Sequence, residues 1–563
     1  MYEKLIKILR NLDEGDLYFL LGKLKESLKE WSFDGKTLEL KQNLVEVIVS
    51  IYGLELFNQK DFREKFFLAT NDLTFINKAC KLANIPTKNK EYFDLAAALS
   101  QMPFKENNLY NYVIHEYLEL PDYRFQVAVD RDVEEKIEIS EKGMNELYDY
   151  QYMIKQQAIN DLSNETKSLY KILIHMPTGT GKTKTTMHII SHYINHISKG
   201  EGMVVWIAHS DELLKQAYET FMSVWKHLGQ KSLTVYKGWN GYPKFFENGI
   251  LFTSIQGLLA KIEKPIFEYI EHKAGLIVFD EVHKAGAEKY SACVEKLMRY
   301  QYDQPKYFIG LTATPGRTTE ISKENKVFSN GFDHIIGIDV DKILRISLNE
   351  NEANNYSGSK DVIRYFQDQQ ILSKLNRKLL DYSVDENTRK ALQKELERDR
   401  DDFSNELLNK ISANIARNIK IVEELRNLYE DKTPTIVFAC SLQHAQMLSA
   451  FLTMDNIPNA LVHGSMTKYE REKAIKDFKN PNSPVKIIIN YEILTTGFDS
   501  TNIKCVFITR PTKSVILYSQ MIGRGLRGPK MGGNKECLLI DVKENLFTYN
   551  ENDAFKHFDE YWG

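Results

Sequence analysis

The chain has 563 residues, of which 43% are apolar and 27% are charged. That length exceeds what one hydrophobic core supports, so we expect three or four domains of a globular protein. No apolar run approaches the roughly 18 to 20 residues of a membrane-spanning helix, so we expect no membrane segment.

The charge balance is nearly neutral, with 74 Lys and Arg against 77 Asp and Glu. Proteins that coat nucleic acid through bulk charge are usually basic, so any nucleic-acid site here is expected to be a local groove. The five cysteines lie far apart without a CxxC pair, which predicts neither a disulfide framework nor a zinc site. The first residues lack the apolar region of a signal peptide, and we therefore expect a cytoplasmic protein.

Residues 1–140 are predicted to form a helical N-terminal domain. Apolar residues recur there at the three- and four-residue spacing of amphipathic helices. The three stripes are Leu5, Ile8, Leu9 and Leu12, then Leu17, Leu20, Leu21, Leu24 and Leu28, then Leu40, Leu44, Val47, Ile48 and Ile51. This region carries no chemical motif. It serves either for packing or for docking a protein partner such as a nuclease.

Residues 141–346 change to short β-rich runs that alternate with helical patterns. The runs are Ile172–Ile174, Val204–Ala208, Ile250–Thr253, Leu276–Phe279 and Phe308–Leu311. This alternation is typical of a parallel sheet with helices on both faces. A second series in residues 431–563 has the runs Ile436–Ala439, Ile487–Ile489, Val506–Ile508 and Leu538–Ile540. We therefore predict an α/β fold with two such domains in tandem.

Between the two series, residues 347–430 are predicted to be a charged helical insertion. The alternating charges of residues 385–406 favour a solvent-exposed helix. After it, one amphipathic helix is indicated by Leu408, Ile411, Ile415, Ile419 and Val422.

The most informative motif is the segment 176–183, MPTGTGKT, which joins an apolar strand to a helical pattern. Such a turn directs backbone N–H groups and the positive end of the helix at a polyphosphate. Lys182 supplies charge for the β- and γ-phosphates, and the Thr183 hydroxyl suits a Mg²⁺ ligand. Position 176 is Met where the motif strictly has Gly. The candidate ATP-binding residues of the loop are Thr178, Gly179, Thr180, Gly181, Lys182 and Thr183.

An acidic pair follows the predicted strand 276–279, in the segment 280–283, DEVH. Acidic residues at the carboxyl end of a buried strand suit a nucleotide site at the sheet edge. Asp280 would hold Mg²⁺, and Glu281 would orient and deprotonate the attacking water. In isolation the pair could be a surface turn, but beside a phosphate loop it indicates phosphoryl transfer.

In the second α/β domain, the segment 520–527, QMIGRGLR, carries Arg524 and Arg527 three residues apart. That spacing is one turn of a helix, so both guanidinium groups could face one ligand. Across a cleft they would meet the γ-phosphate and stabilise the charge of the transition state. Surface arginines are the simpler interpretation, but glycines at 523 and 525 are unfavourable inside a helix unless close approach requires them.

Upstream, the segment TTGFD at 495–499 follows another predicted strand. Asp499 could bind the ribose or an arginine. Thr495, Thr496 and Gly497 could face a phosphodiester backbone.

The order of these motifs, with TAT at 312–314 between DEVH and TTGFD, resembles that of superfamily 2 DExH helicases. The similarity covers about residues 145–545 and is to the branch of type I and type III restriction motor subunits and RadD-like repair helicases. It implies two RecA-like domains that bind ATP and Mg²⁺ between them. The implied catalytic residues are Glu281, Asp280, Lys182, Arg524, Arg527 and Gln520, with Thr183 and Asp280 as Mg²⁺ ligands.

The resemblance also implies further contacts. Gln151 would read the adenine edge, and Gly497 and Asp499 would join the nucleotide site. Tyr148 and Ser210 stand where relatives often carry Arg, which weakens the expected adenine and strand contacts there. The implied nucleic-acid contacts are His209, Thr253, Ser254, Gln256, His463, Thr495 and Thr496. The segments 438–441 and 463–464 resemble the strand-facing motifs of the second domain.

The resemblance therefore implies a nucleic-acid-stimulated ATPase whose domains close and reopen to move along a strand. DNA is favoured over RNA because the similar proteins act on DNA, and DNA repair and antiviral defence are equally open. Three alternatives stand beside this interpretation: a double-strand DNA translocase that does not separate strands, a nucleotide-gated protein that recruits a nuclease, and an RNA helicase.

Overall fold

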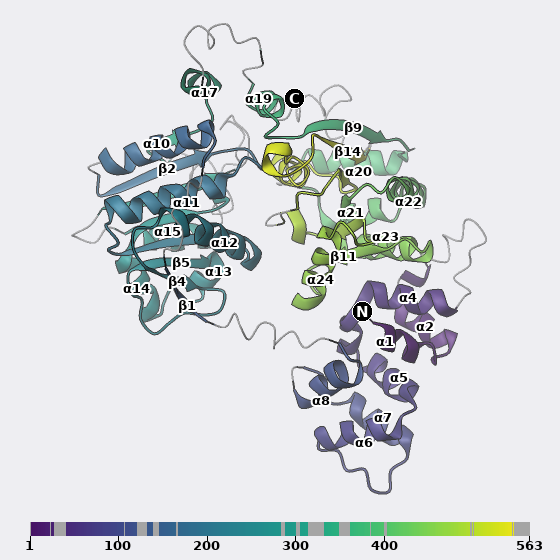
Figure 1. Cartoon of the computed structure of the whole chain (residues 1–563). Helices are drawn as coiled ribbons and strands as arrows, with labels where there is room; N and C mark the ends of the chain where they lie inside the picture. Colours follow the sequence, from purple (N-terminus) through teal and green to yellow (C-terminus); the bar gives the residue numbers. More distant parts are fainter. Residues whose placement is uncertain are drawn as a thin grey trace.

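The computed structural model describes residues 2–22, 24–26, 41–105, 107–120, 132–138, 146–164, 167–282, 288–299, 305–312, 331–347, 358, 361–382, 384–398, 402–495, 498, 500–542 and 544. They form a helical N-terminal domain (residues 2–120) and two α/β lobes (Figure 1). We call residues 132–347 the first lobe and residues 361–544 the second lobe. The predicted fold class is confirmed. Among the described residues, no helix has the length and apolar character of a candidate membrane span.

The N-terminal domain consists of helices packed around one apolar core. Its elements are α1 (Glu3–Leu9), α2 (Glu14–Leu21), α4 (Lys41–Tyr52), η1 (Gly53–Asn58), α5 (Lys60–Thr70), α6 (Leu73–Leu82), α7 (Tyr92–Ser100), α8 (Asn108–Asn111) and η2 (Tyr112–Tyr117). The predicted apolar stripes are buried here, except for Leu28 and Leu40, which lie outside the described residues. Asp13 and Asp72 cap α2 and α6 by accepting hydrogen bonds from backbone N–H groups.

The first lobe is an eight-stranded sheet in the order β1-β4-β5-β3-β6-β7-β2-β8, parallel except for β1 against β4. The strands are β1 (Glu134–Ile137), β2 (Leu169–His175), β3 (Met203–Ala208), β4 (Leu233–Lys237), β5 (Gly249–Ser254), β6 (Ala274–Phe279), β7 (Lys306–Thr312) and β8 (His334–Ile336). All five predicted runs form strands of this sheet. Residues 134–137, which we expected in the N-terminal helical domain, form β1 instead.

Helices cover both faces of the first sheet. They are α10 (Asp149–Asn164), α11 (Lys182–His192), η4 (Tyr193–Ile197), α12 (Asp211–Leu228), α13 (Ile255–Leu259), α14 (Pro265–Lys273), α15 (Glu288–Leu297) and α17 (Val340–Ser347). Alternate residues of β3 point to opposite faces, as a strand requires. Val204 and Trp206 pack with α10, α11 and α12, whereas Val205 and Ile207 pack with α13, α14 and α15.

The second lobe is a six-stranded parallel sheet in the order β11-β12-β10-β13-β14-β9. The strands are β9 (Lys374–Leu380), β10 (Thr435–Phe438), β11 (Asn459–Val462), β12 (Ile487–Asn490), β13 (Cys505–Ile508) and β14 (Glu536–Val542). The helical elements are α19 (Val362–Asp368), α20 (Glu386–Leu396), α21 (Asn405–Ser412), α22 (Ile415–Glu430), α23 (Leu442–Met454), α24 (Lys468–Lys479), η6 (Ile493–Thr495), α25 (Val515–Ile522) and η7 (Pro529–Met531).

The predicted helical insertion, residues 347–430, differs from the structure in two ways. It contains β9, an edge strand in which exposed Lys374, Asn376 and Lys378 alternate with less exposed residues, so its sequence does not resemble a buried strand. The predicted amphipathic helix through Ile411 and Ile415 is two helices, α21 and α22. Asn414 interrupts it, because its side chain accepts a hydrogen bond from the Arg417 N–H at 3.0 Å and caps α22.

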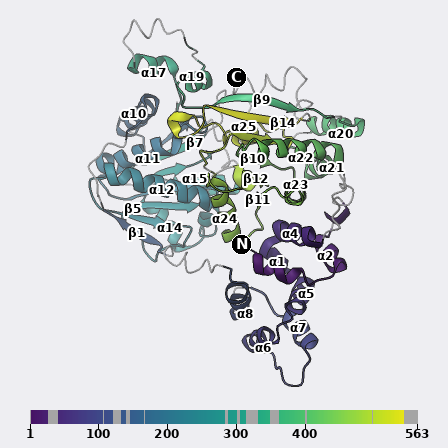
Figure 2. The ribbon, with the colours of Figure 1, turned by 45° about the vertical axis from the view of Figure 1, so that its right-hand side comes forward.

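The N-terminal domain packs on the second lobe, beside α23 and α24 in both views (Figures 1 and 2). Its apolar core is continuous with the core between α22, α23 and one face of the second sheet. The buried carboxylate of Glu470 in α24 accepts hydrogen bonds from the Leu54 N–H at 2.8 Å and from the Tyr2 hydroxyl. The domain is therefore anchored to the second lobe through both apolar and polar contacts.

The second lobe contacts the phosphate-loop side of the first lobe, and helix α24 of the second lobe also approaches helix α12 of the first lobe. Arg471 of α24 lies 3.9 Å from Glu212 of α12, and Lys215 of α12 lies 3.9 Å from Glu472 of α24. A continuous apolar core also links the first lobe to the other face of the second sheet through Phe366 and Leu372.

Candidate nucleotide and nucleic-acid site

The phosphate loop lies between β2 and α11, at the carboxyl edge of the first sheet. Gly179 and Gly181 adopt φ values of 86° and 79°, in the left-handed region that favours glycine. Gly181 directly precedes α11, and the Thr180 hydroxyl donates to the Pro177 carbonyl at 2.7 Å. The turn therefore directs the amino end of α11 toward the space above the loop, as an anion site requires.

Residues at the start of α10 brace this loop. The Gln151 amide donates to the Thr180 carbonyl at 2.9 Å, and the Tyr150 hydroxyl donates to the same carbonyl at 2.8 Å. Burial raises the pKa of Tyr150 well above its ordinary value, so the phenol stays a donor. The Gln151 carbonyl accepts from the Tyr148 N–H at 3.1 Å. Gln151 thus couples this segment to the loop, and its contact with adenine stays a prediction.

Lys182 and the acidic pair come together at this edge. Lys182 Nζ lies 3.3 Å from Oε1 of Glu281 and 3.9 Å from Oδ1 of Asp280, and all three side chains are largely buried. Asp280 directly follows β6, and its backbone N–H donates to the Ile207 carbonyl at 2.9 Å. Glu281 has a φ of 55°, which non-glycine residues rarely adopt and which is typical of functional sites.

The second lobe lies directly against the phosphate loop. A Cβ atom on Gly523 would lie 2.6 Å from Cγ2 of Thr178, so glycine is required there for the lobes to approach. A Cβ atom on Gly179 would lie 3.3 Å from Cδ2 of Leu372 and 3.8 Å from Cγ of Arg527. Glycine is required at position 525 for a different reason, because a Cβ there would collide with Cys537 Sγ and would lie 2.7 Å from Cγ2 of Val506, both inside the second lobe.

The prediction that Arg524 and Arg527 share one helical turn is wrong. Helix α25 ends at Ile522, because Gly523 ends the helix, and Arg524 lies in the turn that follows. Arg527 lies beyond this turn and forms an isolated antiparallel bridge with Leu372. The Arg524 guanidinium donates to the Phe498 carbonyl at 2.5 Å and to the Gln520 carbonyl at 3.2 Å. Arg527 instead lies beside the phosphate loop. The two arginines are therefore placed differently.

A contact between the lobes was missed from the sequence. The Tyr148 hydroxyl donates to the Lys530 carbonyl in the second lobe at 2.8 Å. Met531 also reaches the loop, since a Cβ on Gly181 would lie 3.8 Å from its Cε atom. The only sequence signal was that Tyr148 departs from the Arg common in similar proteins.

The predicted strand-facing residues of the first lobe gather at adjacent ends of β3 and β5, where Ala208 pairs with Ser254. The His209 ring lies against Phe279, and Gln256 is exposed. The Thr253 side chain is fully buried, with its hydroxyl bonded to Tyr242. The Ser254 hydroxyl accepts from the Gly257 N–H at 3.0 Å and caps α13. Thr253 and Ser254 thus have structural partners in this arrangement.

In the second lobe, His463 and Thr495 follow the adjacent strands β11 and β12. His463 is buried, which lowers its pKa, and its Nδ1 lies 3.1 Å from the Ser465 hydroxyl. The Thr495 hydroxyl donates to the Glu492 carbonyl at 2.8 Å. Gln520 is buried within α25, where its carbonyl accepts from Arg524. Thr496, Gly497 and Asp499 lie outside the described residues.

Two family models match the chain. One, described as the type III restriction enzyme res subunit, matches residues 144–317. The other, described as the helicase conserved C-terminal domain, matches residues 417–528. The first spans the phosphate loop and the acidic pair, and the second spans most of the described second lobe up to Gly528.

Curated relatives and a solved structure are also similar to the chain. A protein named as the mitochondrial ATP-dependent helicase irc3 of Schizosaccharomyces pombe is 26% identical over 67% of this chain and 54% of its own length. The type I restriction enzyme EcoAI endonuclease subunit of Escherichia coli is 25% identical over 70% of this chain and 46% of its own length. A solved structure of S. cerevisiae Dbp5 bound to RNA and ADP BeF3 has a TM-score of 0.46 and 13% identity, over 73% of this chain and 87% of that chain.

The chain therefore spans about half the length of the curated relatives just described. From the two matched domains and the motifs they contain, the chain belongs to the superfamily 2 DExH helicases, with similarity to type I and type III restriction enzyme subunits.

Proposed function

We propose that the chain is an ATP-dependent DNA helicase or translocase that hydrolyses Mg-ATP between its two lobes. The observation that carries this proposal is the packing of the second lobe on the phosphate loop. Gly523 contacts Thr178, and Arg527 lies beside Gly179. A triphosphate on the loop would then have the acidic pair on the first-lobe side and Arg527 on the second-lobe side.

The first-lobe residues suit hydrolysis of the γ-phosphate. A water molecule would attack the γ-phosphorus, Glu281 would accept its proton, and the bond to the β-phosphate oxygen would break to release ADP and phosphate. Lys182 lies 3.3 Å from Glu281. A bound triphosphate would offer Lys182 a more highly charged partner, which would free Glu281 to act as the base.

The oxygen donors of Thr183 and Asp280 fit Mg²⁺, which prefers hydroxyl and carboxylate ligands and is commonly shared with substrate phosphates. When bound, the ion would neutralise charge on the β- and γ-phosphates. Arg527 would stabilise the charge that develops on the transferred group. Arg524 would hold the turn in place through the Phe498 carbonyl.

Lobe closure would couple hydrolysis to movement. The ion pairs Arg471–Glu212 and Lys215–Glu472 bridge the lobes at 3.9 Å and are partly exposed, so each contributes only about 0–1 kcal/mol. These two ion pairs therefore oppose opening of the lobes only weakly after the γ-phosphate is lost. The predicted strand-facing residues of each lobe lie at the same sheet edges, so opening would change the distance between the strand contacts of the first lobe and those of the second lobe.

DNA is the proposed nucleic acid, and DNA repair or antiviral defence is the proposed role. The similarity to a type I restriction enzyme subunit supports DNA. The N-terminal domain is the proposed docking region for a protein partner such as a nuclease, because no described residue of the candidate nucleotide site comes from it.

The test measures ATP hydrolysis by the full chain with single-stranded DNA, double-stranded DNA or RNA. Lys182→Ala should abolish turnover, whereas the matched variant Lys184→Ala should retain it, because Lys184 donates to the Glu146 carbonyl outside the loop. Strand-displacement and triplex-displacement assays then separate unwinding from translocation. Normal hydrolysis by Lys182→Ala would contradict the proposal, and stimulation by RNA alone would replace DNA with RNA.

A further inference from the structure

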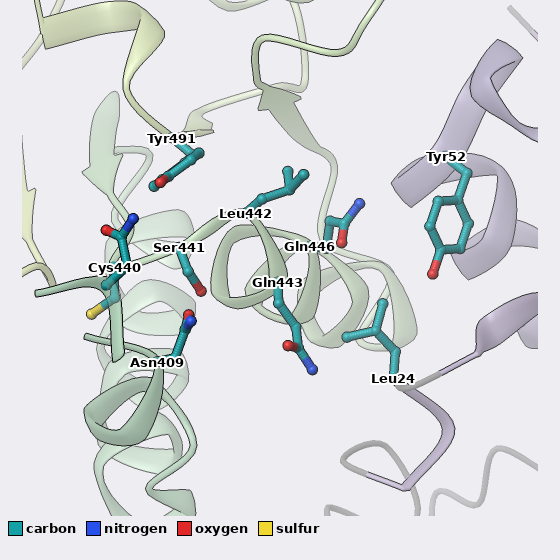
Figure 3. Close-up of a pocket in the computed structure, with 10 residues that line it drawn as sticks. Leu24, Tyr52, Asn409, Cys440, Ser441, Leu442, Gln443, Gln446 and Tyr491 are labelled. Atoms are coloured by element: carbon teal, nitrogen blue, oxygen red, sulfur yellow. The ribbon is translucent and has the colours of Figure 1, made fainter. Parts of the chain in front are cut away.

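A pocket of about 500 Å³ lies where the N-terminal domain meets the second lobe (Figure 3). Tyr52 of α4 comes from the N-terminal domain, and Tyr491, directly after β12, comes from the second lobe. Four carboxamide side chains also line the pocket: Asn405, Asn409, Gln443 and Gln446. None of the ten described lining residues is charged.

Gln446 is the most informative of these side chains. It is only 8% exposed, and its amide makes no hydrogen bond to any residue that the structure describes. In Figure 3 the Gln446 side chain projects from the side of α23 that faces Tyr52. By contrast, buried His444 on the same helix is bonded through both ring nitrogens, to the Cys440 N–H and to Asn418. Gln446 lines the pocket, so its amide offers a donor and an acceptor to a ligand there.

The chemistry of the lining selects a neutral, flat ligand that forms hydrogen bonds. A phosphate or another multiply charged anion would need cationic side chains, and a purely apolar ligand would leave the amides unsatisfied. A nucleobase matches both requirements. Carboxamides pair with the donor and acceptor groups on base edges, and tyrosine rings stack on base faces.

The position of the pocket suits the same ligand. Ser441, which lines it, follows β10, and Tyr491 follows β12, so both lie at the carboxyl edge of the second sheet, where ligands bind in parallel α/β sheets. Residues 438–441 are also a segment that resembles a strand-facing motif. A strand held on this edge could extend an unpaired base toward α4.

We propose that this pocket binds one unpaired base of the nucleic-acid strand, and that the N-terminal domain is therefore part of the nucleic-acid site. The proposal rests on the proposed function, which supplies the strand. The N-terminal domain supplies Tyr52, and its anchoring to the second lobe through Glu470 keeps this wall of the pocket in place.

The test compares the full chain with Gln446→Leu, which keeps the side-chain size and removes the amide. Binding is measured with single-stranded DNA, with single-stranded RNA, and with a strand of the same length made of abasic sites. Gln393→Leu is the matched control, because Gln393 is an exposed glutamine on α20. Thermal unfolding of each variant reports whether the fold is retained.

We expect Gln446→Leu to weaken binding of base-containing strands by about five- to tenfold, the equivalent of one hydrogen bond, and to leave abasic binding unchanged. Because the lining is uncharged, the salt dependence of binding should be the same in the variant. If the substitution weakens binding of single-stranded DNA more than binding of single-stranded RNA, the bound base comes from DNA; the opposite result assigns it to RNA. ATP hydrolysis without nucleic acid should be unaffected.

Equal binding by Gln446→Leu and the unaltered chain would overturn the pocket assignment, as would an equal loss on the abasic strand. Binding of free nucleosides that depends on Gln446, with no effect on strands, would also overturn it. Failure of every strand to stimulate ATP hydrolysis by the unaltered chain is a separate result, which would overturn the proposed function and this assignment with it.

Discussion

The substitution Gly523→Ala should separate closure of the lobes from stability of the fold. Gly523 has ordinary right-handed backbone angles, so alanine is permitted there and is even favoured by about 1 kcal/mol in a helical turn. Its new methyl group would nevertheless lie 2.6 Å from Thr178 Cγ2, about 0.8 Å closer than ordinary van der Waals contact at 3.4 Å. The second lobe must then move away from the phosphate loop.

A displacement of about 1 Å at a catalytic site can lower the rate about 10²-fold. We therefore expect Gly523→Ala to lower kcat/KM for ATP by about 10- to 100-fold, while the free energy of unfolding changes by less than about 1 kcal/mol. Steady-state hydrolysis and urea denaturation measure these two quantities.

Gly525→Ala is the matched comparison two residues away. Its methyl group would collide with Cys537 and Val506 within the second lobe, so it should destabilise that lobe by about 1–3 kcal/mol. If Gly523→Ala hydrolysed ATP at the normal rate, or if it lost as much stability as Gly525→Ala, the contact between Gly523 and Thr178 would not control lobe closure.

Three further predictions follow from named contacts. Arg527→Ala should reduce ATP turnover by about 10³-fold or more while nucleotide binding persists, and normal turnover would remove Arg527 from the site. Glu544→Ala should destabilise the protein by about 3–5 kcal/mol in urea denaturation, because it leaves Arg417, 2.6 Å away and fully buried, without its ion pair. Burial, together with nearby lysines, lowers the pKa of His188 from 6.5 to about 4, so the folded state binds this proton less readily than the unfolded chain. The contribution of neutral His188 to stability is complete above about pH 6.5 and is lost as the pH falls toward 4. His188→Gln should remove about 3 kcal/mol of this acid-induced loss in the free energy of unfolding. An unchanged dependence of the unfolding free energy on pH would contradict the assignment.

Local pattern was enough to predict most of the architecture. Central strands such as β3 and β6 are buried on both faces, so they read as continuous apolar runs that stand out in the sequence. Edge strand β9 was missed for the opposite reason, since its exposed face carries Lys374, Asn376 and Lys378. The break at Asn414 was missed because apolar periodicity continues across it.

The sequence by itself determined the phosphate loop, the acidic pair and the presence of two α/β lobes, because each depends on residues that are close along the chain. Only the tertiary structure decided the contacts between distant segments. It placed Arg527 against Gly179 and Arg524 against Phe498, and it joined the N-terminal domain to the second lobe beside the pocket at Gln446. Such pairings depend on how the lobes and sheets pack, and short-range periodicity carries no information about that packing.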